Sequence, residues 1–220
     1  MSKRSDRNTI STETARRRVR RAGVASLLAL LVGVTTVGTA GSAVAARWVH
    51  DDAAGDVAAL TFGSDGSTMF STVSQDQLRG DIERVAVRHR ATKVKVGIRT
   101  RAAISGPLSS TVVIRTRDHA FLLSWLRTTG VNETDLLDIG RHAAGGVVHC
   151  PGLTRSASSD RKAVRFVIPR SCLRNPSWVR VGVELAMADV AADRSLVDDG
   201  LDDAPLRDFG RPALSPKVGR

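Results

Sequence analysis

The sequence predicts an all-β fold, an antiparallel β-sandwich of about eight strands. Two stretches, 84–90 and 93–101, alternate charged and apolar side chains with period two, as strands with one buried face do. Clusters of Gly, Pro, Asn and Ser separate several further apolar runs, and no amphipathic helix is evident. Further strands are expected at 111–117, 120–128, 136–139, 146–150, 163–168 and 178–188, and one helical turn at 171–174.

The first 45 residues have the features of an export signal. Five arginines between Arg16 and Arg21 precede an uncharged run that ends in the small-residue site Ala43-Val44-Ala45. The sequence therefore predicts a signal peptide at 1–45 and a protein that is secreted or lies in the cell envelope. The uncharged run, 22–46, also approaches the ~20 residues of a membrane span, which leaves open an uncleaved anchor with the domain outside.

Removal of the signal changes the charge of the protein. The chain has 33 Lys and Arg against 22 Asp and Glu, and residues 1–45 hold 8 of the former and 2 of the latter. The remaining 25 and 20 leave a net charge of about +5. Residues 46–188 suit a single β-sandwich domain. An acidic, Pro-containing tail is expected at 189–220.

The two cysteines, Cys150 and Cys172, both lie in the predicted exported part. An even pair in an oxidising compartment is most simply one structural disulfide. Such a bond stabilises the fold by about 3 kcal/mol in the chain-entropy model. The alternatives are a redox pair or a metal site that includes His149, but the spacing is wide for the first and the ligand set is incomplete for the second.

Residues 84–101 are expected to form a hairpin with its turn at Ala91-Thr92. In that register Val87 meets Val96 and Val85 meets Ile98 on the buried face, and like-charged pairs face outward. Residues 84–117 contain no acidic residue. Their basic side chains form the predicted basic face: Arg84, Arg88, Arg90, Lys93, Lys95, Arg99, Arg101, Arg115 and Arg117.

Three explanations of this basic face remain open. It can be a solvated surface, in which charges repel weakly through water and salt. It can be neutralised internally, because residues 189–208 carry seven aspartates against two arginines. It can also bind an anionic partner outside the cell, such as a wall polymer or a lipid surface. Nucleic acid is not expected, because the basic strands carry no aromatic residues for stacking.

The aspartates near the two ends of the exported part are candidates for a calcium site. Calcium prefers hard oxygen ligands, and the acidic clusters supply them without the spacing of an EF-hand loop. The same Asp and Gly clusters are also ordinary turn composition. The candidate ligands are Asp51, Asp52, Asp56, Asp198, Asp199 and Asp202.

No motif for catalysis is evident. The histidines are scattered, without the spacing of a metalloprotease, a serine hydrolase or a phosphate loop. A hydrolase whose site is assembled from distant loops remains the enzymatic alternative. Carbohydrate binding by stacked rings has few residues available, since the chain has no Tyr and Trp125 and Trp178 fall within apolar runs.

Residues 50–190 carry a resemblance. The segments 51–57, 80–89, 94–101 and 168–181, which include Gly80-Asp81-Ile82 and the valine-rich hairpin, resemble a group of uncharacterised exported actinobacterial proteins. They are also distantly similar to the sandwich class of DOMON domains and family 9 carbohydrate-binding modules. This resemblance implies a jelly-roll-like β-sandwich, and a fold analogy by itself does not imply a function.

The sequence thus predicts an exported, non-catalytic protein that binds or associates with the cell envelope, with no cofactor unless calcium is bound. A hydrolase and a calcium- or carbohydrate-binding module are the alternatives.

Overall fold

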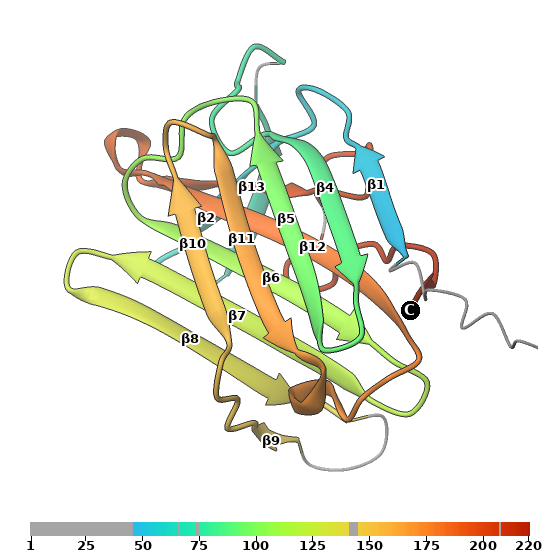
Figure 1. Cartoon of the computed structure of the whole chain (residues 1–220). Coiled ribbons are helices and arrows are strands. Elements are labelled where there is room, and N and C mark those ends of the chain that lie inside the picture. The colour runs from blue at the N-terminus through green and yellow to red at the C-terminus, as the bar shows by residue number, and fades with distance from the viewer. Residues whose placement is uncertain (1–45, 66, 74, 141–144, 207) are drawn as a thin grey trace, which may run out of the picture. The chain divides into compact units, whose positions relative to one another are not determined.

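The protein forms an antiparallel β-sandwich. A computed structural model describes residues 46–65, 67–73, 75–140, 145–206 and 208–220, all of which belong to the compact unit Ser42–Arg220. Two sheets pack face to face (Figure 1), which confirms the predicted fold class. The predicted signal peptide, and all of the predicted anchor except Ala46, lie outside the described residues. Among those described, no helix is long and apolar enough to cross a membrane.

The smaller sheet has five strands, in the spatial order β1-β4-β5-β11-β10. Every neighbouring pair in it is antiparallel. Its strands are β1 (Arg47–Asp51), β4 (Ile82–His89), β5 (Lys93–Thr100), β10 (Thr154–Ser158) and β11 (Ala163–Pro169).

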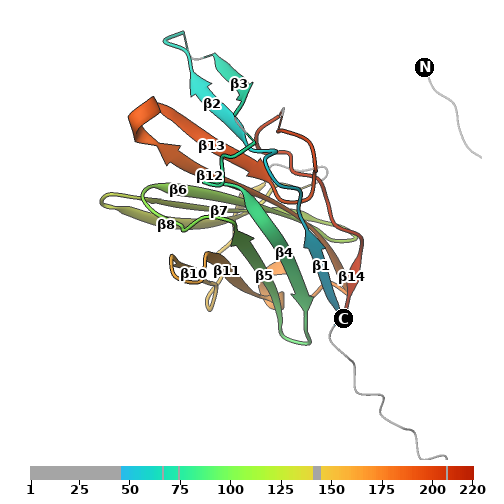
Figure 2. The ribbon, with the colours of Figure 1, turned by 90° about the horizontal axis from the view of Figure 1, so that it is seen from above.

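The larger sheet has nine strands, eight of them in the order β3-β2-β13-β12-β6-β7-β8-β9. The ninth, β14, pairs with the first residues of the long strand β12. Figure 2 shows the β2–β3 hairpin extending away from the two-layered region. The strands are β2 (Ala58–Phe62), β3 (Thr68–Thr72), β6 (Leu108–Arg115), β7 (Ala120–Thr128), β8 (Val131–Asp138), β9 (Gly146–Val147), β12 (Trp178–Asp189), β13 (Arg194–Asp199) and β14 (Val218–Gly219).

The β4–β5 hairpin has the predicted register. Val87 lies opposite Val96, Val85 opposite Ile98, and the basic pair Arg88 and Lys95 also face each other. A shift of one residue would turn the apolar side chains of a strand toward water, so burial of one face determines this pairing. The hairpin therefore presents apolar side chains to the core and basic side chains to solvent.

The main core lies between the two sheets. Each sheet contributes alternate side chains, as expected for strands buried on one face. The ring of Phe166 meets that of Trp125 edge-on, with 5.9 Å between the centroids. The largest fully buried side chains of this core are Phe121, Phe166, Ile82, Ile98, Leu108, Ile114, Leu123, Leu136, Ile168, Leu173, Leu185 and Met187.

The predicted disulfide is present. Cys150 and Cys172 are bonded, with 5.4 Å between their Cα atoms. The bond ties the segment after β9 to the 3-10 helix η1 (Arg170–Leu173), which lies where a helical turn was predicted. Within η1, the Arg170 side chain is buried and donates to the carbonyl oxygens of Ala91, Asn175 and Pro176.

The number of strands and the extent of the C-terminal tail differ from the predictions. The described residues form fourteen strands instead of about eight, because β1, β2, β3, β10, β13 and β14 were not predicted. Residues 189–220 are not only a tail. They include the strands β13 and β14 and the short 3-10 helix η2 (Val190–Ala192). Asp and small polar residues are depleted in strands in general, so composition hides strands that are held by pairing and burial.

Candidate functional site

A basic groove runs over the outer face of the five-stranded sheet. Its volume is about 1330 Å³. Nine basic side chains and only two acidic side chains, Glu83 and Asp160, line it. The basic residues of the groove are Arg84, Arg88, Lys95, Arg99, Arg101, Arg155, Arg161, Lys162 and Arg165.

The groove results from the alternation of long and small side chains on the outer face of the sheet. Alternate residues of a strand face outward. On β4 and β5, long basic side chains occupy most of the outward positions, and the small residues Ala86 and Gly97 occupy outward positions between them. Ala86, Gly97 and Arg165 lie side by side across three strands, because Gly97 pairs with both neighbours. Two of these three residues have little or no side chain, so the groove can have a low floor between basic walls.

Some groove charges are already paired. Arg84 forms an ion pair with Asp51, and the Nε of Arg99 lies 3.0 Å from the Oε2 of Glu83. In the described part of the chain, Arg88, Lys95 and Arg165 form no ion pair. These three side chains lie on adjacent strands and are available to an anionic ligand.

The structure divides the predicted basic face between two sheets. Five of its nine residues line the groove: Arg84, Arg88, Lys95, Arg99 and Arg101. Arg90 and Lys93 lie at the hairpin turn, where the N–H of Arg90 donates to the Lys93 carbonyl oxygen. Arg115 and Arg117 lie elsewhere, because Arg115 belongs to β6 of the larger sheet and Arg117 follows that strand.

Sequence reasoning missed four basic residues of the groove. Arg155, Arg161, Lys162 and Arg165 come from β10, β11 and the turn between them. Arg165 lies in the strand predicted at 163–168, but the sequence does not show that this strand, β11, pairs with β5. None of the described residues of 189–220 lines the groove, so neutralisation by the predicted tail finds no support among them.

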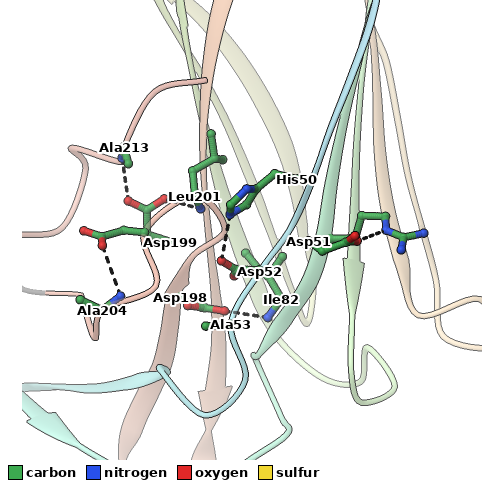
Figure 3. Close-up of polar contacts among 12 residues, drawn as sticks. His50, Asp51, Asp52, Ala53, Ile82, Asp198, Asp199, Leu201, Ala204 and Ala213 are labelled. Carbon is green, nitrogen blue, oxygen red and sulfur yellow. Dashed lines mark hydrogen bonds and ion pairs between the residues drawn. The ribbon is translucent and has the colours of Figure 1, made fainter. Parts of the chain in front are cut away.

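A second site is a cluster of buried carboxylates, which we call the acidic cluster: Asp52, Asp56 and Asp198. One side-chain oxygen from each lies within 4.8 Å of one from each of the others. Asp52 and Asp56 belong to the loop after β1, and Asp198 comes from β13, more than 140 residues later. Figure 3 shows Asp52 and Asp198 on neighbouring segments, with Asp51 directed to the other side, toward the hairpin.

Hydrogen bonds to carboxylates hold the backbone around the cluster. The Oδ2 of Asp198 accepts a 2.7 Å hydrogen bond from the N–H of Ile82, which links the larger sheet to the smaller. Asp81 accepts hydrogen bonds from the N–H of Gly55 and from the Nε of Arg101, at 2.9 and 2.8 Å. Gly55 has a φ of +79°, and a Cβ there would lie 2.9 Å from the Gln75 carbonyl oxygen, so the loop requires glycine.

Arg101 joins the acidic cluster to the groove. It lines the groove, and its Nη2 donates to the carbonyl oxygens of Asp52 and Ala53 at 2.7 and 2.9 Å. Its guanidinium is thus directed to Asp81 and to backbone oxygens. Within the described part of the chain it forms no ion pair with the acidic cluster, although its charge lowers the pKa of Asp56.

Burial shifts the ionisation of these groups. Burial first, and then the charges of Asp198 and Asp56, raise the pKa of Asp52 to about 9. Burial also raises the pKa of Asp56 to about 6 and that of Asp198 well above its usual value. Two neighbouring carboxyls behave similarly, since burial raises the pKa of Asp199 to about 6 and that of Glu184 to about 7.

The structure brings together three of the six predicted calcium ligands. Asp51 instead pairs with Arg84, and Asp202 is exposed and accepts a hydrogen bond from the N–H of Ala204. Asp199 is buried, but its two oxygens accept hydrogen bonds from the N–H groups of Leu201 and Ala213. Residues that sequence reasoning missed near the cluster are His50, Asp81 and Asp203.

A third hollow contains two of the scattered histidines. Its volume is about 790 Å³, and His119, His149, Asp138 and Ser171 are among its lining residues. The Nδ1 of His119 lies 3.3 Å from the Oδ2 of Asp138. A hydrolase would need a nucleophile hydrogen-bonded to such a histidine. In the described part of the chain, the one polar contact found for the two imidazoles is that of His119 with Asp138, and Cys150 and Cys172 are joined in the disulfide.

Comparison with known proteins identified no relative. No protein-family model, curated protein or solved structure matches this chain. The resemblance to DOMON domains, family 9 carbohydrate-binding modules and exported actinobacterial proteins therefore remains a sequence-based prediction.

Proposed function

We propose that this protein is an exported, non-catalytic binding module that holds an extended anionic polymer of the cell envelope in its basic groove. The observation that supports it is the excess of nine basic over two acidic side chains in one groove of about 1330 Å³. A polyanion bound there would neutralise charges that the described chain leaves unpaired, notably on Arg88, Lys95 and Arg165.

The form of the groove favours a polymer over a membrane. A membrane surface generally attracts basic residues that are accompanied by apolar side chains able to enter the lipid. The groove has one exposed large apolar residue, Leu78, at its margin among the described residues. Small floor residues such as Gly97 and Ala86 leave room for a chain, so a wall polymer that carries phosphate or uronate groups is the better match.

Exposed aromatic rings do not contribute to this groove. The one aromatic residue that lines it among the described residues is Phe166, whose side chain is buried in the core. Neutral sugars are commonly held by stacking on such rings, whereas charged polymers are held by cations. The proposed recognition is therefore electrostatic, and we expect it to weaken with salt.

The test is retention of residues 46–220 on isolated cell envelopes. The double variant Arg88→Glu with Lys95→Glu reverses two charges that face each other on β4 and β5, so the cross-strand repulsion is about the same before and after. The matched control, Arg115→Glu with Arg117→Glu, makes the same charge change at exposed positions outside the groove.

We expect the wild-type protein and the control to be retained at about 0.05 M salt and released near 1 M, where the Debye length falls to ~3 Å. The groove variant should be lost from the envelope at both salt concentrations. Equal loss in the two double variants would refute the groove as the site, and retention on anionic lipid vesicles but not on delipidated walls would replace the polymer with a membrane surface.

A further inference from the structure

Four oxygen atoms of the acidic cluster are buried without a hydrogen-bond partner. They are both carboxylate oxygens of Asp52 and both of Asp56, whose residues are only 6% and 4% exposed. Buried polar groups nearly always have a partner, and a buried charge needs a counter-charge or a metal. The nearest cationic groups are the His50 ring, whose Nε2 lies 3.7 Å from the Oδ1 of Asp52, and Arg101, whose charge lowers the pKa of Asp56. Two buried carboxylates without a hydrogen bond in one place therefore indicate that a cation belongs between them.

The third carboxylate completes a cation-sized arrangement. One oxygen each from Asp52, Asp56 and Asp198 lies within 4.8 Å of the others, which is about twice the 2.3–2.6 Å length of a calcium–oxygen bond. Oxygens bound to one calcium ion have such separations. We propose that Asp52, Asp56 and Asp198 bind a calcium ion, at a site separate from the basic groove.

The donor set favours calcium over other common metals. All three members offer oxygen alone, whereas zinc sites in proteins are built mainly from Cys and His. Magnesium usually retains several of its waters and takes one or two carboxylates, whereas calcium accepts six to eight oxygens, often from bidentate carboxylates. Three buried carboxylates hold up to six such oxygens. The remaining positions can be filled by backbone oxygens or water.

His50 and Asp203 form the outer side of the site. The Nε2 of His50 lies 3.7 Å from the Oδ1 of Asp52, and one oxygen of Asp203 joins these two within 4.8 Å. Asp203 is exposed, whereas the Nε2 of His50 is buried, so Asp203 is the solvent-facing member of this outer group. The ring of Trp48 stacks on that of His50 at 5.8 Å between centroids, which places a tryptophan close to the proposed ion.

A cation here would join parts of the chain that are distant in sequence. Asp52 and Asp56 lie on the loop that leads from the smaller sheet into the larger, and Asp198 lies in β13. The ion would then fasten the loop after β1 to β13, which lies between β2 and β12 in the larger sheet. Its removal would loosen the β1–β2 loop first.

The experiment uses residues 46–220 stripped with chelator and titrated with calcium chloride, magnesium chloride or terbium chloride. Thermal unfolding should shift upward by about 5 °C or more when calcium exceeds its Kd by 100-fold. Terbium emission excited through tryptophan should appear, fall on addition of calcium, and be reduced in Trp48→Phe. In Asp52→Asn and Asp56→Asn, calcium affinity should fall at least about tenfold, whereas the exposed-strand control Asp135→Asn should bind as the wild type does.

Several results would overturn the proposal. One is the absence of any shift with calcium in a protein whose circular dichroism shows a folded sheet. Another is full calcium affinity in both ligand variants, and a third is a larger shift with magnesium than with calcium. If a ligand variant fails to fold, terbium titration of the wild type and of Trp48→Phe still decides whether an ion binds beside this tryptophan. Because the groove variant leaves these residues unchanged, calcium binding and polymer retention can succeed or fail independently.

Discussion

The metal-free protein should become less stable as pH rises, and Asp52 should cause a large share of the loss. Its pKa is raised from 3.8 to about 9 by burial and by the charges of Asp198 and Asp56. A carboxyl whose pKa is higher in the folded state than in the unfolded state contributes stability below the unfolded value. That stability is lost as pH rises from about 4 toward 9.

The size of the effect follows from linkage. Between these two pKa values the folded chain keeps one proton that the unfolded chain has released, so the free energy of unfolding falls by about 1.4 kcal/mol per pH unit. Between about pH 5 and pH 7, Asp52 alone should therefore remove about 3 kcal/mol. This is a large part of the total stability of a typical domain, roughly 5–15 kcal/mol.

Asp52→Asn isolates this contribution. Asn has the shape of the protonated carboxyl but does not titrate, so the variant should gain about 3 kcal/mol relative to wild type between about pH 5 and pH 7 in chelator. With saturating calcium the order should reverse, because the variant lacks a ligand. Urea unfolding, followed by tryptophan fluorescence at several pH values, measures the free energy of unfolding in chelator and in calcium. Asp135→Asn is the control at an exposed position. A stability difference between wild type and Asp52→Asn that does not change with pH would refute the reasoning.

Three further variants test which interactions stabilise the fold. Replacing both Cys150 and Cys172 by serine should lower the free energy of unfolding by about 3 kcal/mol, measured by urea unfolding. Arg101→Ala should cost about 3–5 kcal/mol, because it leaves the fully buried carboxylate of Asp81 without its cation. Phe166→Ala should cost about 3–5 kcal/mol, because it opens a cavity in the main core.

Each of these expectations has its own check. Reduction of the wild-type disulfide should lower the free energy of unfolding as much as the double serine substitution does. An unchanged free energy of unfolding would contradict the expected stabilisation by the disulfide. Asp81→Asn added to Arg101→Ala should recover part of the loss; no recovery would mean that the buried charge is not its cause. Phe209→Ala, at a 42% exposed position, should cost much less than Phe166→Ala, and equal costs would contradict the core assignment.

Local features were predicted well from the sequence. Alternation with period two identified the β4–β5 hairpin, including the pairing of Val87 with Val96. The two cysteines left a single pairing to consider. In both cases the decisive partners are close in sequence, so the hydrophobic pattern and the spacing carry the information.

The two candidate sites depended on contacts between distant segments. Arg165 joins the groove because β11 pairs with β5, and Arg115 is excluded from it because β6 lies in the other sheet. Asp198 belongs to a segment whose composition predicted an acidic tail, yet pairing of β13 buries it.

The sequence by itself determined a sandwich with one basic hairpin and one disulfide, because residue periodicity and cysteine count act locally. Only the tertiary structure decided which charges share a surface and which carboxylates share a buried space. Strand order is a property of the whole chain, and the burial that raises the pKa of Asp52 exists only after β13 has packed beside the loop that follows β1.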